Sequence, residues 1–176
     1  MDSTVTLRSR SAQTLGVVMV VVSVAGLVSS VVDGLDTMLR FGAPLALFGV
    51  AGWGAFWQPH VEVSDGGVRV ANTLRTIDVP WPAIESVDGR YGLRLTTAYG
   101  RVDAWGAAAP AGRQRARQQE SPAARAVIDR LERLRASGHL DDPRLERPAP
   151  HTVWHRPLVL ALGVLALASL VLPLLA

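Results

Sequence analysis

The sequence predicts an α+β membrane protein in which a small antiparallel β-sheet with a capping helix is anchored by helices that cross the membrane. Two observations carry this prediction: three long uncharged apolar blocks, and a stretch between the second and third blocks whose apolar residues alternate with polar ones. The 176 residues leave room for one or two small domains, and hydrophobic residues make up 49% of the chain. Because these residues are concentrated in blocks, a uniformly soluble globular protein is excluded.

Two apolar blocks near the N-terminus predict a transmembrane helical hairpin over residues 14–57. The blocks span residues 15–32 and 41–57, and neither contains a charge. At about 1.5 Å per residue, a helix of this length crosses most of the hydrocarbon core of a bilayer. A secretory signal peptide is the alternative for the first block, but that block is longer than a usual signal-peptide core and a second block follows almost at once. The third block, residues 157–176, predicts a further span at the C-terminus.

The arginines predict the orientation of the spans, because cytoplasmic segments next to spans carry an excess of basic residues. All 18 basic residues are arginine, and the net charge is only +3. Arg8 and Arg10 precede the first span, whereas the connector at residues 33–40 holds two acids and one arginine. We therefore expect the N-terminal tail, residues 1–13, and the region between the second and third spans to be cytoplasmic, and the C-terminus to lie outside.

Small residues recur in the second block and allow helices to approach closely. Gly42 and Ala46 lie four residues apart, and three glycines follow at positions 49, 52 and 54. This spacing fits either association with a second copy or a partner's helix, or packing against the first span of the same chain. We favour packing within the chain.

Residues 58–137 predict a small antiparallel β-sheet with a helix that covers it. Apolar residues alternate with polar ones over residues 60–106, and turns, most of which contain glycine, divide this stretch into six short strands. We expect Val, Ile, Leu and Trp side chains on the inner face of the sheet. A sheet of about 50 residues is marginal by itself, so it needs a cover.

A helix over residues 122–136 is expected to provide that cover. Ser121 is a typical N-cap, a proline follows at the first helical position, and Gly138 comes after the last turn. The apolar residues of the segment share one helix face: Ala124, Val127, Leu131 and Leu134. Residues 106–120 lack periodicity and predict a linker, and residues 138–156, which contain three prolines, predict an extended tether to the last span.

Three short motifs in the predicted sheet carry a resemblance to a known family. They are Gly66-Gly67-Val68, Leu74-Arg75-Thr76, and Val79-Pro80-Trp81 followed by Ile84 and Val87. With the two spans ahead of them, they resemble actinobacterial membrane-anchored proteins that carry a bacterial pleckstrin-homology (PH) domain, of the type named after low-molecular-weight protein antigen 6. The resemblance covers roughly residues 14–137 and implies a PH-like fold, which serves many binding roles.

The first hairpin departs from a pattern found in eukaryotic relatives of this fold. Those relatives often hold inositol phosphates with basic residues on the first hairpin. Here the turn Ser64–Gly67 contains one acid and no basic residue. The resemblance therefore does not carry a phosphoinositide site over to this chain.

Five arginines are the candidate residues for contact with a lipid surface: Arg113, Arg115, Arg117, Arg144 and Arg147. Near an anionic membrane, each such residue contributes about 1 kcal/mol to binding. The alternative is a solvated linker whose charge only sets the topology, and the sequence leaves both readings open. We do not expect nucleic acid as a partner, because the basic residues are interleaved with acids and no base-reading motif is present.

Two tryptophans and two histidines are further candidates for a site. Trp81 and Trp105 fit either a ligand platform or the core of the sheet, and we favour the core because tryptophan on the inner face of a small sheet is usually buried. His151 and His155 lie four residues apart and would suit a metal if they were on a helix. A pair without a third ligand is a weak metal signal, so we favour an anchor at the membrane interface.

No residue pattern predicts catalysis, a cofactor or a metal site. The chain contains no cysteine, which excludes a thiol nucleophile and thiolate ligands, and it lacks a nucleophile elbow and a phosphate-binding glycine loop. We expect a non-enzymatic, multi-pass protein of the inner (plasma) membrane that presents a PH-like domain at the cytoplasmic face. Its expected partners are the lipid bilayer and a recruited protein or a second copy.

The alternative function is that of an accessory subunit of a membrane enzyme or transporter complex, acting through its spans. Proton and ion relays within a membrane use ionisable side chains. The three uncharged blocks contain none. We therefore favour the presentation of the PH-like domain.

Overall fold

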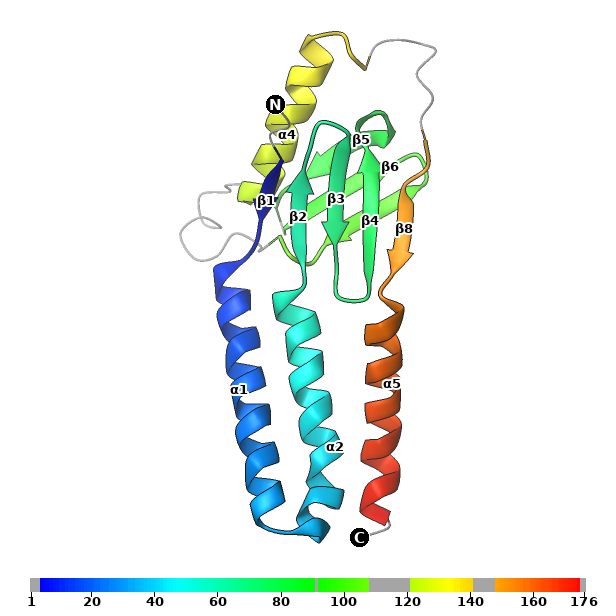
Figure 1. The fold of residues 1–176 in the computed structure, drawn as a ribbon. Coiled ribbons are helices and arrows are strands. Elements are labelled where there is room, and N and C mark those ends of the chain that lie inside the picture. Colours follow the sequence, from blue (N-terminus) through cyan, green and yellow to red (C-terminus); the bar gives the residue numbers. More distant parts are fainter. Residues whose placement is uncertain (1–3, 91, 108–120, 141–147, 175–176) are drawn as a thin grey trace. The chain divides into compact units, whose positions relative to one another are not determined.

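The computed structural model describes residues 4–90, 92–107, 121–140 and 148–174 and divides into two compact units (Figure 1). The β unit consists of residues 1–9 and 59–154, and the helical unit consists of residues 10–58 and 155–176. The predicted α+β class is confirmed: the chain has a helical N-terminal part, antiparallel β-sheets and a C-terminal helix.

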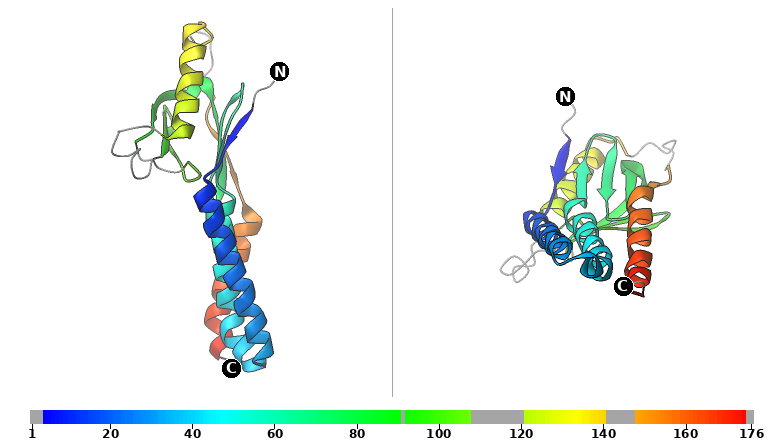
Figure 2. Two further views of the ribbon diagram at one scale, coloured as in Figure 1. Left: turned by 90° about the vertical axis from the view of Figure 1, so that its left-hand side faces the viewer. Right: turned by 60° about the horizontal axis from the view of Figure 1, so that its bottom comes forward.

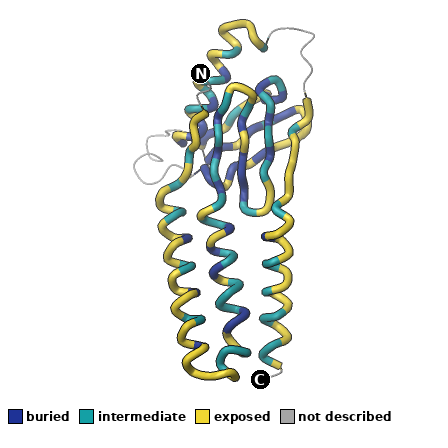
Figure 3. The backbone as a smooth tube through the Cα atoms, in the orientation of Figure 1, coloured by how far each residue is buried: buried dark blue, intermediate teal, exposed yellow. Residues whose placement is uncertain are grey.

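The helical unit contains α1 (Arg10–Val32), α2 (Leu35–Gly52) and α5 (Arg156–Val171). A π-helical turn, Trp53–Trp57, continues α2, and a 3-10 turn, Leu172–Leu174, continues α5. By length and composition, all three helices are candidates to cross a membrane. Helix α2 packs against both α1 and α5. Most residues of α1 and α5 are exposed or half-buried, which suits helices whose surface meets lipid (Figure 3).

The second helix begins earlier than the uncharged block. It starts at Leu35 rather than Phe41, so Asp36 lies in its first turn and Arg40 also lies within it. Only two residues connect it to α1, and one of them, Gly34, has a φ of 107°, which residues with a side chain rarely adopt. A carboxylate is favourable at the N-terminus of a helix, which accounts for Asp36 being helical although it is charged.

Two glycines of α2 mark close contact with α1. A Cβ added at Gly49 would overlap the Ser23 hydroxyl, and one added at Gly52 would lie 2.7 Å from the Cβ of Met19. Ser23 Oγ also donates a hydrogen bond to the Leu45 carbonyl at 2.7 Å. At these positions the preferred reading, packing of small residues within one chain, is confirmed.

The β unit contains two antiparallel sheets, so the expectation of one six-stranded sheet was wrong (Figure 1). The five-stranded sheet has the order β1 (Val5–Leu7), β2 (His60–Val63), β3 (Gly67–Ala71), β4 (Arg75–Pro80) and β8 (His151–Trp154). The three-stranded sheet has the order β5 (Ile84–Asp88), β6 (Leu93–Thr97) and β7 (Gly100–Ala104). A 3-10 turn, Trp81–Ala83, separates β4 from β5. Pro80 and Pro82 account for this break, because proline cannot donate to a strand ladder.

Two of the strands that the structure describes lie in segments that we expected to be a tail and a tether. Strand β1 pairs with β2, with Val5 opposite Val63, and β8 pairs with β4, with Trp154 opposite Arg75. Both are edge strands of three or four residues, and every residue of β8 is exposed. Without one buried face, such a strand lacks the alternation by which strands are recognised in a sequence.

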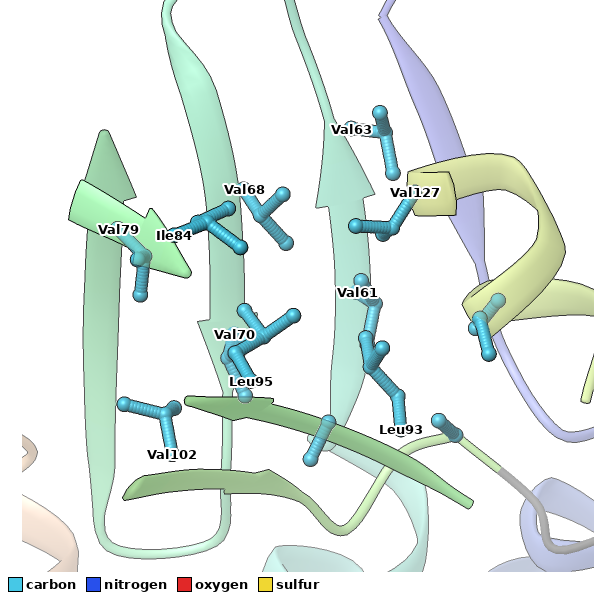
Figure 4. Close-up of a cluster of buried hydrophobic side chains, with 14 of the residues drawn as sticks. Val61, Val63, Val68, Val70, Val79, Ile84, Leu93, Leu95, Val102 and Val127 are labelled. Carbon is cyan, nitrogen blue, oxygen red and sulfur yellow. The ribbon is translucent and has the colours of Figure 1, made fainter. Parts of the chain in front are cut away.

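The hydrophobic core lies between the two sheets and α4 (Pro122–Ala136) (Figure 4). The strands contribute Val61, Val63, Val68, Val70, Ile77, Val79, Ile84, Leu93, Leu95 and Val102. Helix α4 lies against the sheets and contacts β2, β5 and β6 (Figure 2). It covers them with Ala124, Val127 and Leu131, while Leu134 is partly buried. The helix begins and ends at the predicted residues.

Ser121 caps α4 and ties the helix to the three-stranded sheet. Its Oγ accepts a hydrogen bond from the Ala124 amide at 3.1 Å and donates to the Gly92 carbonyl at 3.3 Å. The Ser121 amide donates to the Gly89 carbonyl at 3.3 Å. The predicted N-cap is therefore confirmed, and such a cap contributes about 1 kcal/mol to stability.

Candidate functional site

The arginines that the sequence singles out for lipid contact lie outside the described residues. They belong to two segments, residues 108–120 with Arg113, Arg115 and Arg117, and residues 141–147 with Arg144 and Arg147. Their contact with lipid stays a prediction.

The turn between β2 and β3 is held against α4. Asp65, the acid of this turn, forms an ion pair with Arg130 of the helix. Ser64 Oγ donates a hydrogen bond to the Gly67 carbonyl at 3.1 Å across the turn. The turn therefore uses its carboxylate to fix the helix, and it offers no cation to a phosphate.

Four polar side chains form a line across the outer face of the five-stranded sheet, which we call the charge line: His60, Glu62, Arg69 and Asp78. Arg69 Nε donates to Asp78 Oδ1 at 2.6 Å, and Arg69 Nη1 lies 3.6 Å from Glu62 Oε2. His60 Nε2 lies 3.3 Å from Glu62 Oε1. The hydrogen bond to Asp78 and the charge of that carboxylate raise the pKa of Arg69 above its ordinary value. The guanidinium is thus held between two carboxylates.

A surface cavity of about 330 Å³ opens at the β2–β3 hairpin beside the charge line. Its lining consists of Thr4, Glu62, Ser64, Gly66, Gly67, Val68, Arg69, Asp78, Val79 and Pro80. The lining holds two carboxylates and one guanidinium, which is already paired. An anion would be repelled by the excess of negative charge, so this cavity suits a polar or basic group better than a phosphate.

The two tryptophans of the predicted sheet lie in opposite environments. Trp81 is 3% exposed and its Nε1 donates to the Ser64 carbonyl at 3.0 Å, which confirms the core assignment. Trp105 is 75% exposed, so its assignment to the core was wrong. The reason is the alternation within β7: Val102 and Ala104 face the core, which places the next residue on the outer side.

Asn72, which sequence analysis did not single out, joins the two sheets at the turn between β3 and β4. Its Nδ2 donates to the Asp103 carbonyl at 2.9 Å, and its Oδ1 accepts from the Trp105 amide at 2.8 Å. Both partners are backbone groups at the end of β7. The side chain therefore fixes the backbone of Trp105 and leaves the indole outside the core.

His151 and His155 do not share a helix, so the spacing that a metal pair would use is absent. His151 lies on β8, and His155 is the residue before α5. His155 Nδ1 is hydrogen-bonded to Gln58 Nε2 at 2.8 Å. Among the residues that the structure describes, no cluster of three His, Cys, Asp or Glu side chains is placed to hold a metal.

The helical unit carries an apolar groove of about 240 Å³. It is lined by Gly16, Val17, Val20, Val21, Trp53 and Trp57, from α1 and from the π-helical turn after α2. The lining is almost entirely hydrocarbon and aromatic, which suits an acyl chain or another apolar helix.

Comparison with known proteins found a family match for one part of the β unit. Residues 58–137 match the model of a family described as "Bacterial PH domain". No curated protein and no solved structure matched. The matched segment contains β2 to β7 and α4. Strands β1 and β8 and the three candidate spans lie outside it.

The match agrees with the three motifs that carry the resemblance, all of which lie within it. It also contains the two sheets' central strands, the covering helix and the core between them. Residues 58–137 of this chain therefore form a PH-like domain that matches the bacterial PH domain family.

Proposed function

We propose that the protein is a non-enzymatic, multi-pass membrane protein that presents its PH domain at the cytoplasmic face of the plasma membrane, where the domain recruits a protein or contacts the lipid surface. The observation that carries this proposal is the length of the connectors. Two residues separate β1 from α1, two separate Trp57 from β2, and one separates β8 from α5. Three connectors this short keep the domain beside any membrane that the helices cross.

The distribution of charge supports the orientation. Arg10 and Arg156 are the first residues of α1 and α5, at the helix ends that lead into the PH domain. The opposite end of the α1–α2 pair carries Asp33 and Asp36. By the positive-inside rule, the end with the arginines faces the cytoplasm.

The surface of the domain supports a binding role. The side chains of the charge line are paired with one another. PH-like folds serve as scaffolds for binding rather than as carriers of one activity. Ion pairs on an exposed sheet contribute at most about 1 kcal/mol to stability, so their exchange for contacts with a partner costs little.

Single cysteines can test the orientation without background labelling, because the chain contains no cysteine. Asp33→Cys lies between α1 and α2, and Glu85→Cys lies on β5; both positions are exposed. We expect a membrane-impermeant maleimide to label Asp33→Cys in intact cells and Glu85→Cys only after permeabilisation. Labelling of Glu85→Cys in intact cells would contradict a cytoplasmic PH domain, and extraction of the chain by alkaline carbonate would contradict membrane insertion.

Photo-crosslinking in cells separates recruitment, lipid contact and the accessory-subunit alternative. A photoreactive amino acid at Arg101, exposed on β7, samples the domain, and one at Leu167, exposed on α5, samples the spans. We expect one reproducible protein adduct from Arg101 if the domain recruits, and no protein adduct from either position if the domain contacts only the membrane. Adducts with a membrane protein from Leu167 and none from Arg101 would favour the accessory subunit instead.

A further inference from the structure

The chain connections to the candidate spans all leave the β unit at one end of the five-stranded sheet. Strand β1 ends opposite the beginning of β2. His60, which begins β2, lies opposite Ala71, which ends β3, and Trp154, which ends β8, lies opposite Arg75, which begins β4. These strand ends therefore lie at the same end as the β3–β4 turn, residues 72–74 (Figure 1). We call this end of the PH domain the tethered end.

Three large apolar side chains are exposed at the tethered end. Leu74 in the β3–β4 turn is 38% exposed, Trp154 is 54% exposed, and Trp105 is 75% exposed. Trp105 belongs to this end because Asn72 of the same turn accepts a hydrogen bond from its amide. Exposed apolar groups of this size mark a surface that meets a partner or a membrane.

The chemistry of these side chains fits the headgroup region of a bilayer. Tryptophan is enriched there because its ring is apolar while its N–H stays hydrated. The Arg75 guanidinium lies 5.7 Å from the centre of the Trp154 ring, which places a cation beside the aromatic group where anionic headgroups would meet it. At the β2–β3 hairpin, by contrast, the cavity is lined by two carboxylates and a paired arginine.

The connectors restrict what can reach the tethered end. Each contains one or two residues, and an extended residue spans at most about 3.6 Å, so the chain passes from a strand end to a helix end over roughly 10 Å. We propose that the tethered end is a lipid-contacting surface, which places Trp105, Leu74 and Trp154 among the headgroups of the bilayer that the helices cross. This inference rests on the proposed function, because it requires α1, α2 and α5 to be membrane spans.

The test measures how deeply fluorescent labels enter the lipid when the full chain is held in nanodiscs of phosphatidylcholine and phosphatidylglycerol. The test variants are Leu74→Cys and Trp105→Cys, and the matched control is Tyr99→Cys. Tyr99 is 59% exposed and lies in the β6–β7 turn, whereas Trp105 follows the other end of that hairpin, where Leu93 pairs with Ala104. We expect lipids with brominated acyl chains to quench the labels at 74 and 105 several-fold more than the label at 99, and aqueous iodide to show the reverse order.

Trp105→Cys removes the indole whose contact with lipid is tested, so a second measurement examines Trp105 through the label at position 74. Adding Trp105→Ser to the Leu74→Cys variant should lower the quenching of the label at 74 by lipid, because the tethered end loses its largest anchor. No change in this double variant would overturn the role of Trp105.

The remaining outcomes separate this inference from the proposed function. If the chain stays in the nanodiscs while iodide quenches the labels at 74, 99 and 105 equally, the lipid-contacting surface is overturned and the membrane protein stands. If neither quencher reaches position 105, a protein covers it and the inference is overturned. A chain that does not stay in nanodiscs overturns both.

Discussion

Trp81→Ala is expected to lower the free energy of unfolding of the PH domain by about 4 kcal/mol. Trp81 is part of the core cluster, and its Nε1 donates to the Ser64 carbonyl at 3.0 Å. The substitution leaves a cavity between the two sheets and also leaves that carbonyl without its indole partner, and the two costs add. Because small domains are stable by only about 5–15 kcal/mol, a loss of this size removes a large part of the total.

Urea unfolding of the full chain in nanodiscs, followed by far-ultraviolet circular dichroism, measures this effect. Trp105→Ala is the matched control, because it removes the same side chain from an exposed position of the same domain. We expect the control to lower the free energy of unfolding far less than Trp81→Ala does, because its indole lies outside the core and only its contact with the headgroups is lost. Equal losses for the two variants would contradict the assignment of Trp81 to the core and Trp105 to the surface.

Gly67→Ala is expected to have the next largest effect, a loss of about 3 kcal/mol, at the upper end of the range for overpacking. A Cβ added at Gly67 would overlap the Val79 carbonyl oxygen and lie 3.0 Å from the Cα of Pro80. Both are backbone atoms of β4, and Gly67 is paired with Pro80 in the ladder between β3 and β4. The clash can therefore be relieved only by separating two strands whose inner faces form the core.

The adjacent glycine provides the control for this prediction. No heavy atom lies within 4 Å of a Cβ added at Gly66, so Gly66→Ala should change the free energy of unfolding by less than about 0.5 kcal/mol. The same urea titration compares the two variants. If both substitutions cost the same, the effect comes from the flexibility of the turn and not from contact with β4.

The elements that could be predicted from the sequence are those with strong local signals. Helix α4 has a capping serine, a glycine after its last turn and one apolar face, so its ends could be placed correctly. The three long helices follow from uncharged length alone, although α2 extends to Leu35 because a helix N-terminus accepts Asp36. The motifs of the PH domain lie in strands and turns whose pairing is local.

The elements that could not be predicted depend on contacts between distant segments. Strand β8 pairs with β4 although α4 lies between them in the chain, and it has no buried face that would show alternation. The exposed position of Trp105 could have been found by counting in twos from Ala104, whereas the bonds of Asn72 to β7 depend on how two sheets meet. The tethered end is defined by the pairing of β8 with β4 and by the bonds of Asn72 to β7. Both join distant segments, so no local sequence pattern could predict it.

The two edge strands have a consequence for how the domain is handled as a fragment. Strands β1 and β8 are the two edge strands of the five-stranded sheet, yet both lie outside residues 58–137. A fragment cut at those boundaries would expose the backbone N–H and C=O groups of β2 on one side and of β4 on the other. Unpaired edges of this kind recruit strands from other molecules. Self-association of such a fragment would therefore be caused by the loss of β1 and β8. Only a fragment that keeps both strands would show whether the domain of the full chain self-associates.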